Sequence, residues 1–422
     1  MKQYQSKHCL SVASLLAQVE FSKIYEWKSA LLFIFYVVVN YYFCIILYKH
    51  QNCLKYNFNM RLKSLKLKNY RNCKNIEINF CDFKNLIIGK NAQGKTNILE
   101  SIYFLSNLKS VRTSNNLDLI KFGTEKTEIN AVIEKNNTNI EMDFFYNDEK
   151  KKKFALNKVK STQKYFRQVL KTVLFSSEDL MLLRGVPEDR RKWLDRAISQ
   201  IYPLYEERIS KYEKIRTQKN NLLKDEKCDK NLLEVYNEQL AIAGSNVIFL
   251  RKKYLSEIEK IAKQKHSNIS EQENLKIYYS STFELGETVE EILENYKSSL
   301  KENYNEELRR MQSLIGPHRD DIVFFINDND STKFASQGQQ RTIVLALKMA
   351  EIDIIKEKVG TSPILLLDDV LAELDDLRQN YLLNSINRET QTIITSVDTL
   401  FFNEEFLKDV KIFKINEGKI IG

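Results

Sequence analysis

The stretch "GKNAQGKTNILESIYFL", which begins at Gly89, decides how the rest of the chain is interpreted. It contains the pattern G-x-x-x-x-G-K-S/T, whose glycines let backbone N–H groups wrap a phosphate at the positive end of a helix. The context fits, because an apolar strand pattern precedes the loop and a helical pattern follows it. The stretch predicts a nucleotide-binding loop made of Gly89, Lys90, Asn91, Ala92, Gln93, Gly94, Lys95 and Thr96.

A phosphate loop of this type works with an acid at the end of a buried strand. We expect Lys95 to neutralise the β and γ phosphates as a catalytic residue and Thr96 to ligate Mg²⁺. The run "ILLLDDV" offers Asp368 as the second Mg²⁺ ligand and Asp369 as the catalytic residue that orients or deprotonates the attacking water. The alternative is that the two acids only cap a strand end.

Most of the chain lies between the lysine and the acids, which is too much for a compact kinase or GTPase. Positions 201–266 carry apolar residues every three or four residues, and "KDEKCD" divides them into two helical segments. We expect an α/β fold: an ABC-type ATPase head, a P-loop NTPase, with a short antiparallel helical arm between its halves. The expected parts are 60–200 with the phosphate loop, 201–300 as the arm (lobe II), and 301–422 with the acids. A plain helical-bundle core is the alternative for the arm.

The strands expected on either side of this arm come from period-two alternation and from short apolar runs. They are "RLKSLKLKNYRN", "NIEINF", "NLIIG", the hairpin "TEINAVIE" with "TNIEMDFFYND", "DIVFFIND", "PILLLDDV", "QTIITSVD" and the closing hairpin "VKIFKINEGKIIG".

A polar, glycine-containing turn, "SQGQQRT", opens a predicted helix upstream of the acids. An ABC-type ATPase carries its signature loop at this position. The predicted role is a second helix N-terminus for an anion, with Ser336 and the Gly338 backbone offered to a γ-phosphate on another subunit. The stretch "LAELD" that follows the acids has the position of a D-loop, which crosses the dimer seam. As a lone helix cap the turn would carry no function.

Composition and charge are those of an intracellular protein that meets a polyanion. The formal net charge of +9 favours anionic partners such as nucleic acid. The six cysteines form no C-x-x-C pair and match no zinc spacing, so we expect reduced thiols and a cytoplasmic location.

The N-terminal region needs a separate interpretation. From Ala30 to Tyr48 the chain carries no charge and is long enough for a membrane span. One interpretation is a single-span anchor. The other, which we favour, is that the functional start is Met60, with residues 1–59 an extension from upstream sequence, because a strand pattern begins abruptly there. We expect no stable membrane association.

Seven stretches together resemble one known family. They are "LKLKNYRNC", "GKNAQGKTNILESIYFLS", "VRTSNNLDLIKFG", "VLFSSEDLMLLRGVPEDRRKWLD", "LIGPHRDDI", "ASQGQQRTIVLALKMAE" and "LLLDDVLAELD". The resemblance is to the RecF family, SMC-like ABC ATPases of bacterial recombinational repair, and it spans residues 60–422.

The resemblance implies a two-lobed head without zinc hook or nuclease, two copies of which sandwich two ATP molecules and clamp single-stranded or gapped DNA. Partners would be the RecR and RecO mediators, which help load RecA and support SOS induction. By match to the family motifs, Arg71 and Asn91 lie near the nucleotide, while Ser336, Gly338 and Gln339 reach the partner's ATP. Arg112 is a further coupling or phosphate residue.

The chain departs from the wider ABC pattern in two places. The loop "FSSEDL" has Ser177 where the family usually has proline and offers no Q-loop glutamine, and no switch histidine follows "IITSVD". Both features favour slow hydrolysis that acts as a timer, and with the DNA binding that the resemblance implies we expect a slow, DNA-dependent ATPase. His318 is interpreted as structural, with Arg319 and Asp320 tying the lobes together. The rival functions are a non-hydrolysing SMC-like scaffold and the ATPase subunit of a membrane transporter.

Overall fold

The computed structural model describes residues 60–421. The predictions made for residues 1–59, the extension and its apolar segment from Ala30 to Tyr48, lie outside the described residues. Within the described part, no helix is long and apolar enough to cross a membrane.

A mostly parallel sheet forms the centre of the described chain. Its strand order is β15-β14-β3-β13-β12-β8, and all neighbours pair in parallel except β15, which returns antiparallel on β14. The central strands are short apolar runs buried on both faces, as parallel strands between layers require. The strands are β3 (Lys84–Ile88), β8 (Thr172–Ser176), β12 (Ile364–Asp368), β13 (Thr392–Ser396), β14 (Val410–Asn416) and β15 (Lys419–Ile420).

A second, antiparallel sheet has the order β2-β1-β4-β5-β6-β7. Its strands are β1 (Met60–Tyr70), β2 (Cys73–Asn79), β4 (Lys126–Lys135), β5 (Thr138–Asn147), β6 (Lys152–Leu156) and β7 (Val159–Lys160). The predicted β4–β5 hairpin is confirmed, and Asn136 and Asn137 at its tip adopt the left-handed backbone with φ of 53° and 60°. Two such residues suit the twist of a tight hairpin.

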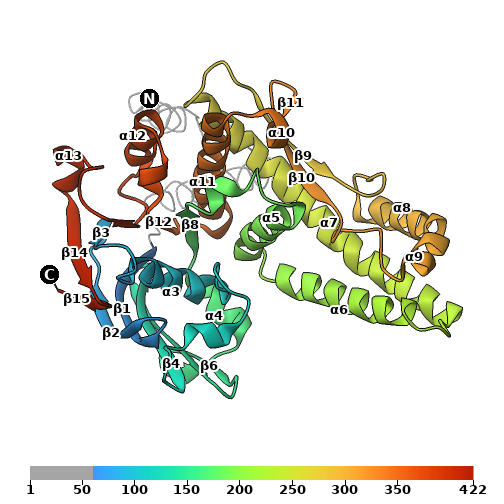
Figure 1. Ribbon diagram of the computed structural model, residues 1–422, viewed down its shortest axis with the longest axis horizontal. Coiled ribbons are helices and arrows are strands. Elements are labelled where there is room, and N and C mark those ends of the chain that lie inside the picture. Colours follow the sequence, from blue (N-terminus) through green and yellow to red (C-terminus); the bar gives the residue numbers. More distant parts are fainter. Residues whose placement is uncertain (1–59, 422) are drawn as a thin grey trace, which may run out of the picture. The chain divides into compact units, whose positions relative to one another are not determined.

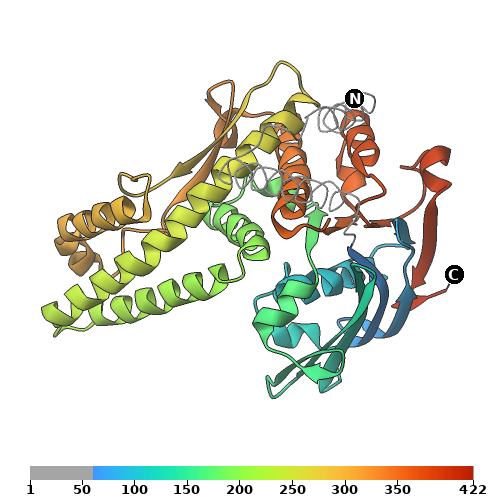
Figure 2. The ribbon, with the colours of Figure 1, turned by 180° about the vertical axis from the view of Figure 1, so that it is seen from behind.

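Helix α3 (Lys95–Asn107) lies between the two sheets (Figures 1 and 2). Nearly all of its residues are buried, and Ile98, Leu99 and Phe104 share one apolar cluster with both sheets. A helix that is covered all round is held in place by packing on every side. The phosphate loop that precedes α3 is therefore built on rigid elements.

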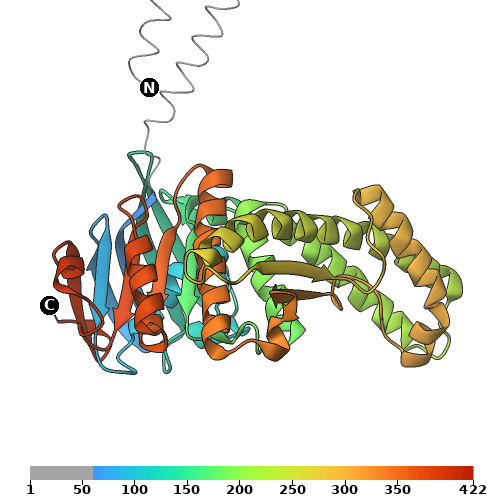
Figure 3. The ribbon, with the colours of Figure 1, turned by 90° about the horizontal axis from the view of Figure 1, so that it is seen from above.

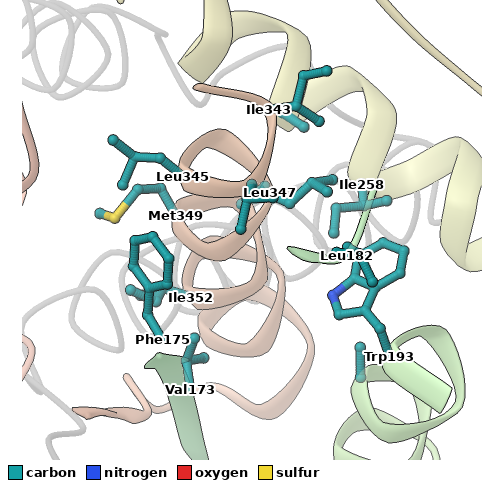
Figure 4. Close-up of a cluster of buried hydrophobic side chains, with 14 of the residues drawn as sticks. Val173, Phe175, Leu182, Trp193, Ile258, Ile343, Leu345, Leu347, Met349 and Ile352 are labelled. Carbon is teal, nitrogen blue, oxygen red and sulfur yellow. The ribbon is translucent and has the colours of Figure 1, made fainter. Parts of the chain in front are cut away.

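Helix α11 (Gln337–Val359) covers the other face of the parallel sheet. Figure 4 shows Met349 on the side of Phe175 of β8, and Leu347 on the side of Ile258 and Trp193. Ile258 comes from α7 (Lys230–Ser267) and Trp193 from α5 (Pro187–Ile201). The helix that starts at the predicted signature turn is thus in one core with the sheet and with the base of the arm.

The predicted pair of arm helices is confirmed. Helix α6 (Tyr205–Leu223) packs antiparallel on α7, and the segment "KDEKCD" joins them (Figure 1). The last part of α7 packs on α11 (Figure 3). Helices α8 (Val289–Glu302) and α9 (Tyr304–Arg310) follow, and α8 packs on α7.

A strand within the range expected to be helical arm was missed. Strand β9 (Leu275–Ser280) pairs antiparallel with β10 (Asp321–Ile326), and the short β11 (Asn329–Asp330) completes a three-stranded sheet. The sequence "LKIYYS" alternates only over its first residues, so its pattern was too short to separate from the flanking helices. The division of the chain at 200 and 300 stays a prediction. The remaining helices are α4 (Gln163–Val169), α10 (Ser331–Phe334), α12 (Asp376–Ser385) and α13 (Glu404–Leu407).

Candidate nucleotide-binding site

The glycine loop between β3 and α3 has the backbone that a phosphate cradle needs. Gly94 has φ of 107°, a left-handed conformation, and precedes α3 without any side-chain cap. A Cβ at Gly89 would lie 2.6 Å from the carbonyl oxygen of Ile415 on β14, so only glycine fits there. With no side chain capping the helix, its first N–H groups and its positive dipole end are offered to an external anion.

Lys95 is held over this loop. Its side chain is 3% exposed, and its Nζ donates a hydrogen bond to the carbonyl oxygen of Gly89 at 2.8 Å. The same Nζ lies 3.5 Å from Asp369 Oδ2. A buried ammonium is costly unless it is paired, and this one has a carbonyl and a carboxylate. The positive charge is thus fixed where the phosphates of a nucleotide would lie.

Asp368 ends β12 beside the phosphate loop. Its Oδ1 accepts a hydrogen bond from Thr96 Oγ1 at 3.1 Å and another from Thr395 Oγ1 at 2.8 Å. Burial, followed by the nearby charge of Asp369, raises the pKa of the Asp368 carboxyl above its ordinary value. A bound cation would stabilise the charged form of this buried carboxyl group.

Asp369 is the least satisfied of these side chains. Its backbone is left-handed, with φ of 50°, and its N–H donates to Thr395 Oγ1 at 2.9 Å. Its Oδ1 is buried and has no hydrogen-bond partner among the described residues. Buried carboxylate oxygens are normally bonded, so an unpartnered one that lines a cavity points to a missing water, ion or ligand.

The donor set fits Mg²⁺. The hydroxyl of Thr96 and the carboxylate of Asp368 are hard oxygen donors, and Mg²⁺ usually takes one or two protein oxygens together with water and nucleotide phosphates. Among the described residues, no group of three or more His, Cys, Asp or Glu could hold a metal by itself. The phosphates would therefore have to supply part of the coordination.

A cavity of about 790 Å³ joins these elements, a volume in the range of small-molecule sites. Most of the predicted site residues line it: Arg71, Asn91, Ala92, Gly94, Lys95, Thr96, Asp368 and Asp369. Gly89, Lys90 and Gln93 instead support the loop: two offer carbonyls to the lysine, and Gln93 Oε1 accepts a hydrogen bond from the N–H of Glu417. Residues from the first and the second half of the described chain thus meet at one cavity.

Two arginines also line the cavity. Arg71 donates to Glu100 through Nε at 3.0 Å and Nη2 at 2.6 Å, and Glu100 is 1% exposed on α3. Arg112 Nη1 donates to Asn97 Oδ1 at 2.8 Å and lies 4.0 Å from Glu100. Glu100 therefore orients Arg71, which keeps its positive charge at the cavity. Sequence reasoning missed this acid, although a glutamate inside an otherwise apolar helical run was the signal.

The sequence predicted no role for Thr395, which lies in the stretch "IITSVD". Its hydroxyl donates to Asp368 Oδ1 and accepts the Asp369 N–H, so one side chain at the end of β13 positions both acids. Parallel neighbours end at the same edge of a sheet, which is why β13 can do this for β12.

The predicted signature residues do not line this cavity. Ser336 caps α11: its Oγ accepts the Gln339 N–H at 3.2 Å, and Gln339 Oε1 accepts the Ser336 N–H at 2.8 Å. Gln339 Nε2 also donates to Glu273 Oε1 at 2.8 Å. A side chain at Gly338 would be tightly packed, since a Cβ there would lie 3.2 Å from Arg378 Nη2. A role at another subunit's nucleotide stays a prediction.

The segment without a Q-loop glutamine still connects the cavity to α11. Ser177 and Glu178 line the cavity. The next residue, Asp179, forms an ion pair with Lys348, whose Nζ lies 2.8 Å from Asp179 Oδ1. Lys348 lies on α11 and is 3.9 Å from Glu351. This buried ion pair joins the cavity to the helix whose N-cap is Ser336.

His318 lies away from the cavity, at the junction of the arm. Its Nδ1 bonds Tyr212 OH on α6 at 2.6 Å, and its Nε2 lies 3.1 Å from the Ser313 carbonyl oxygen. Asp320 accepts from Tyr279 OH at 2.6 Å, but Arg319 reaches only the nearby Gln312. The structural interpretation of His318 and Asp320 agrees with these contacts. Among the described residues the Arg319 side chain hydrogen-bonds only Gln312, so its role as a tie between lobes stays a prediction.

Because His318 is buried, we expect the free energy of unfolding to fall as the pH is lowered. Burial lowers its pKa to about 3, whereas an unfolded histidine has a pKa of about 6.5. The stabilising difference is present above the unfolded pKa and is lost as pH falls toward the folded one. Between about pH 7.5 and about pH 5 we expect His318 to remove about 2 kcal/mol from the free energy of unfolding. Urea unfolding at both values should show a smaller loss in His318→Gln; an equal loss would contradict this.

The fold and this site define an ABC-type P-loop ATPase head of the SMC class, as predicted. The family described as "RecF/RecN/SMC N terminal domain" matches residues 61–420. RecF proteins of Staphylococcus carnosus and Bacillus pumilus, each named "DNA replication and repair protein RecF", are 40% identical over 370 residues, covering 86% of this chain and 100% of theirs. The chain belongs to the RecF family.

Solved structures agree with this assignment. Two structures of the recombination mediator protein RecF in the RecFOR pathway, described as "RecF-ATPrS" and "RecF-ATP", are 34% identical, with TM-scores of 0.79 and 0.78. Each covers 86% of this chain and 98% of its own. A Smc head bound to the C-winged helix domain of ScpA, 15% identical with a TM-score of 0.50 over 86% of this chain and 97% of its own, shares the fold.

Proposed function

We propose that this chain is an ATP-dependent DNA-binding protein of recombinational repair and replication restart. Two copies close on single-stranded or gapped DNA when ATP binds. The observation that carries the proposal is that Lys95, Thr96, Asp368 and Asp369 meet at one cavity that Ser336 does not line. Such a site has the phosphate loop and the acids but not the signature turn. This arrangement is expected if the nucleotide is shared between two subunits and the partner supplies its turn.

The proposed cofactors are ATP and Mg²⁺. A solved RecF relative is described as "RecF-ATP", which supports the choice of nucleotide. Thr96 and Asp368 would hold Mg²⁺, which supplies positive charge against the phosphates. The chain's own contribution is the ammonium of Lys95 and the N–H groups at the start of α3.

The second half of the proposed site is the start of α11. This helix begins after Ser336 and has no acidic residue of its own in its first turn, and the positive dipole end of such a helix favours an anion. In a dimer, Ser336, Gly338 and Gln339 would meet the γ-phosphate held by the partner copy. The γ-phosphate then acts as the link between the two heads, and ADP lacks it.

Hydrolysis ends this link in our proposal. Asp369 has a buried, unpartnered carboxylate oxygen, which suits a group that orients or deprotonates water. The absence of a Q-loop glutamine and of a switch histidine from the sequence supports slow turnover, and we propose that DNA stimulates it. ATP hydrolysis is then a timer for release, without nuclease activity.

DNA and the RecR and RecO mediators are the proposed partners. The net charge of +9 supports phosphate binding, and a solved relative described as a mediator of the RecFOR pathway supports the choice of protein partners. We further propose, from family membership, that the protein helps load RecA and supports SOS induction. The proposed location is the cytoplasm, where bacterial chromosomal DNA is found.

Sizing of the full chain by light scattering tests the proposal. We expect a monomer alone and with ADP, a dimer with ATP and Mg²⁺, and a dimer bound to gapped duplex whose affinity falls steeply with added salt. If about six phosphates are contacted, a fourfold rise in salt should weaken binding about 1,000-fold. A protein that stays monomeric with ATP, with and without DNA, would overturn the clamp.

A non-hydrolysing scaffold is the second candidate. The distance of 3.5 Å between Asp369 Oδ2 and Lys95 Nζ favours it, because the ion pair occupies one of the two carboxylate oxygens that could otherwise contact the attacking water. Measuring phosphate release from ATP in the presence of gapped DNA distinguishes the ATPase from the scaffold. A rate no higher than that of buffer without protein supports the scaffold.

A further inference from the structure

Phe122 has the most exposed large apolar side chain in the described part of the chain. Its relative exposure is 101%, and the next most exposed, Leu400, has 87%. Single exposed apolar residues are common, so exposure alone carries little weight. The position of Phe122 carries more, because it lines the same cavity as Lys95 and Thr96.

The turn that carries this ring is braced. Ile120 forms a β-bridge with Tyr70, and the N–H of Lys121 donates to the carbonyl oxygen of Asn69 at 2.9 Å. The N–H of Thr124 returns to the carbonyl oxygen of Lys121 at 3.0 Å, closing the turn. An exposed ring on a braced turn is presented at a fixed place, since the backbone beneath it has few alternatives.

The same turn is connected to the phosphate loop. Asn72, which follows the β1 strand end, donates from Nδ2 to the carbonyl oxygen of Ala92 at 3.2 Å. Its Oδ1 accepts from Asn97 Nδ2 on α3 at 2.6 Å. Lys121 Nζ donates to the carbonyl oxygen of Asn72 at 3.2 Å. Hydrogen bonds therefore lead from the phosphate loop to the turn of Phe122.

We infer that Phe122 is the stacking platform for the base of the nucleotide whose phosphates the loop at Lys95 holds. The inference rests on the proposed nucleotide site and adds a residue for its base. A cavity of about 790 Å³ has room for a base and sugar beside the triphosphate. Phe122 is the one aromatic residue among the described residues that line the cavity, beside polar side chains such as Arg71 and aliphatic ones such as Ile120.

Stacking on a phenyl ring has a defined energetic signature. It removes apolar surface of both partners from water and depends on the flat face of the base, so every base gains from it. Loss of the ring should weaken adenine and guanine nucleotides alike by about tenfold or more. A ligand with phosphates but no base should not change.

Calorimetric titration of the full chain with ADP, GDP and inorganic tripolyphosphate tests the inference. Phe122→Ala should bind both nucleotides about tenfold more weakly and tripolyphosphate within about twofold of the parent. Phe122→Trp should retain nucleotide binding. Tyr278→Ala, which removes an exposed aromatic ring on β9 outside the cavity, is the matched control and should change neither.

Three results would overturn the inference. Nucleotide binding by Phe122→Ala equal to the parent would show that no base stacks there. An equal loss for tripolyphosphate would show that the ring supports the phosphate loop instead. Unchanged ADP binding with weaker ATP-driven dimerisation would assign the ring to the partner subunit. ADP binding needs no dimer, so the inference and the clamp proposal fail separately.

Discussion

Lys95→Met should abolish ATP-driven dimerisation of the full chain. The ammonium is 3% exposed and fixed by Gly89, so its charge acts at short range in a site with little water. Removing one partner of a buried charge pair costs about 3 kcal/mol or more, which is about a 100-fold loss of ATP affinity. Light scattering at an ATP concentration that dimerises the parent should show monomer.

Two further variants separate charge from fit. Lys95→Arg keeps the charge, but a guanidinium is too large for a position that is 3% exposed, so we expect the same loss of dimer. Lys74→Met removes an exposed lysine on β2 and should dimerise like the parent. Lys74→Met should unfold at the temperature of the parent, and thermal unfolding should confirm that each Lys95 variant is still folded at the assay temperature. A dimer formed by Lys95→Met with ATP would refute the shared-nucleotide model.

Asp369→Asn should separate closing from opening. The amide keeps the size of the side chain and removes its basicity, while Lys95, Thr96 and Asp368 still bind the nucleotide. We expect ATP-driven dimers to persist and phosphate release with gapped DNA to fall about 100-fold or more, the usual contribution of a positioned base. The two readouts are light scattering and a phosphate-release assay on the same sample.

Asp369→Glu is the control for this result. It restores a carboxylate one methylene further out and should retain part of the turnover. If Asp369→Asn releases phosphate at the rate of the parent, Asp369 is not the base. If Asp369→Asn fails to dimerise with ATP, the carboxylate is needed to bind the nucleotide rather than to orient or deprotonate the attacking water.

The elements that sequence reasoning predicted share one property, a strong local pattern. The hairpin of β4 and β5, the arm helices α6 and α7, and strand β12 each show it over their full length. Strand β9 was missed because its alternation covers only a few residues, and its pairing with β10 joins positions about 45 residues apart in the chain. A local pattern of apolar residues cannot indicate which distant strand will pair with it.

The same division applies to the site. Gly94, Lys95 and Thr96 are contiguous, and a turn of this kind before a helix binds phosphate through its own backbone. Glu100, Thr395 and Phe122 were not predicted as site residues, because each acts through a residue or cavity distant in sequence. A threonine at a strand end is unremarkable until the neighbouring strand brings two acids beside it.

The sequence by itself determined the kinds of chemistry: a phosphate loop, a pair of acids after a buried strand and a serine–glycine turn that starts a helix. These depend on short-range backbone geometry, which a few adjacent residues specify. The tertiary structure alone decided which groups meet. Strand pairing in the parallel sheet brings Asp368 to Thr96 across 272 positions and leaves Ser336 off the cavity, because such contacts arise only when the whole core packs.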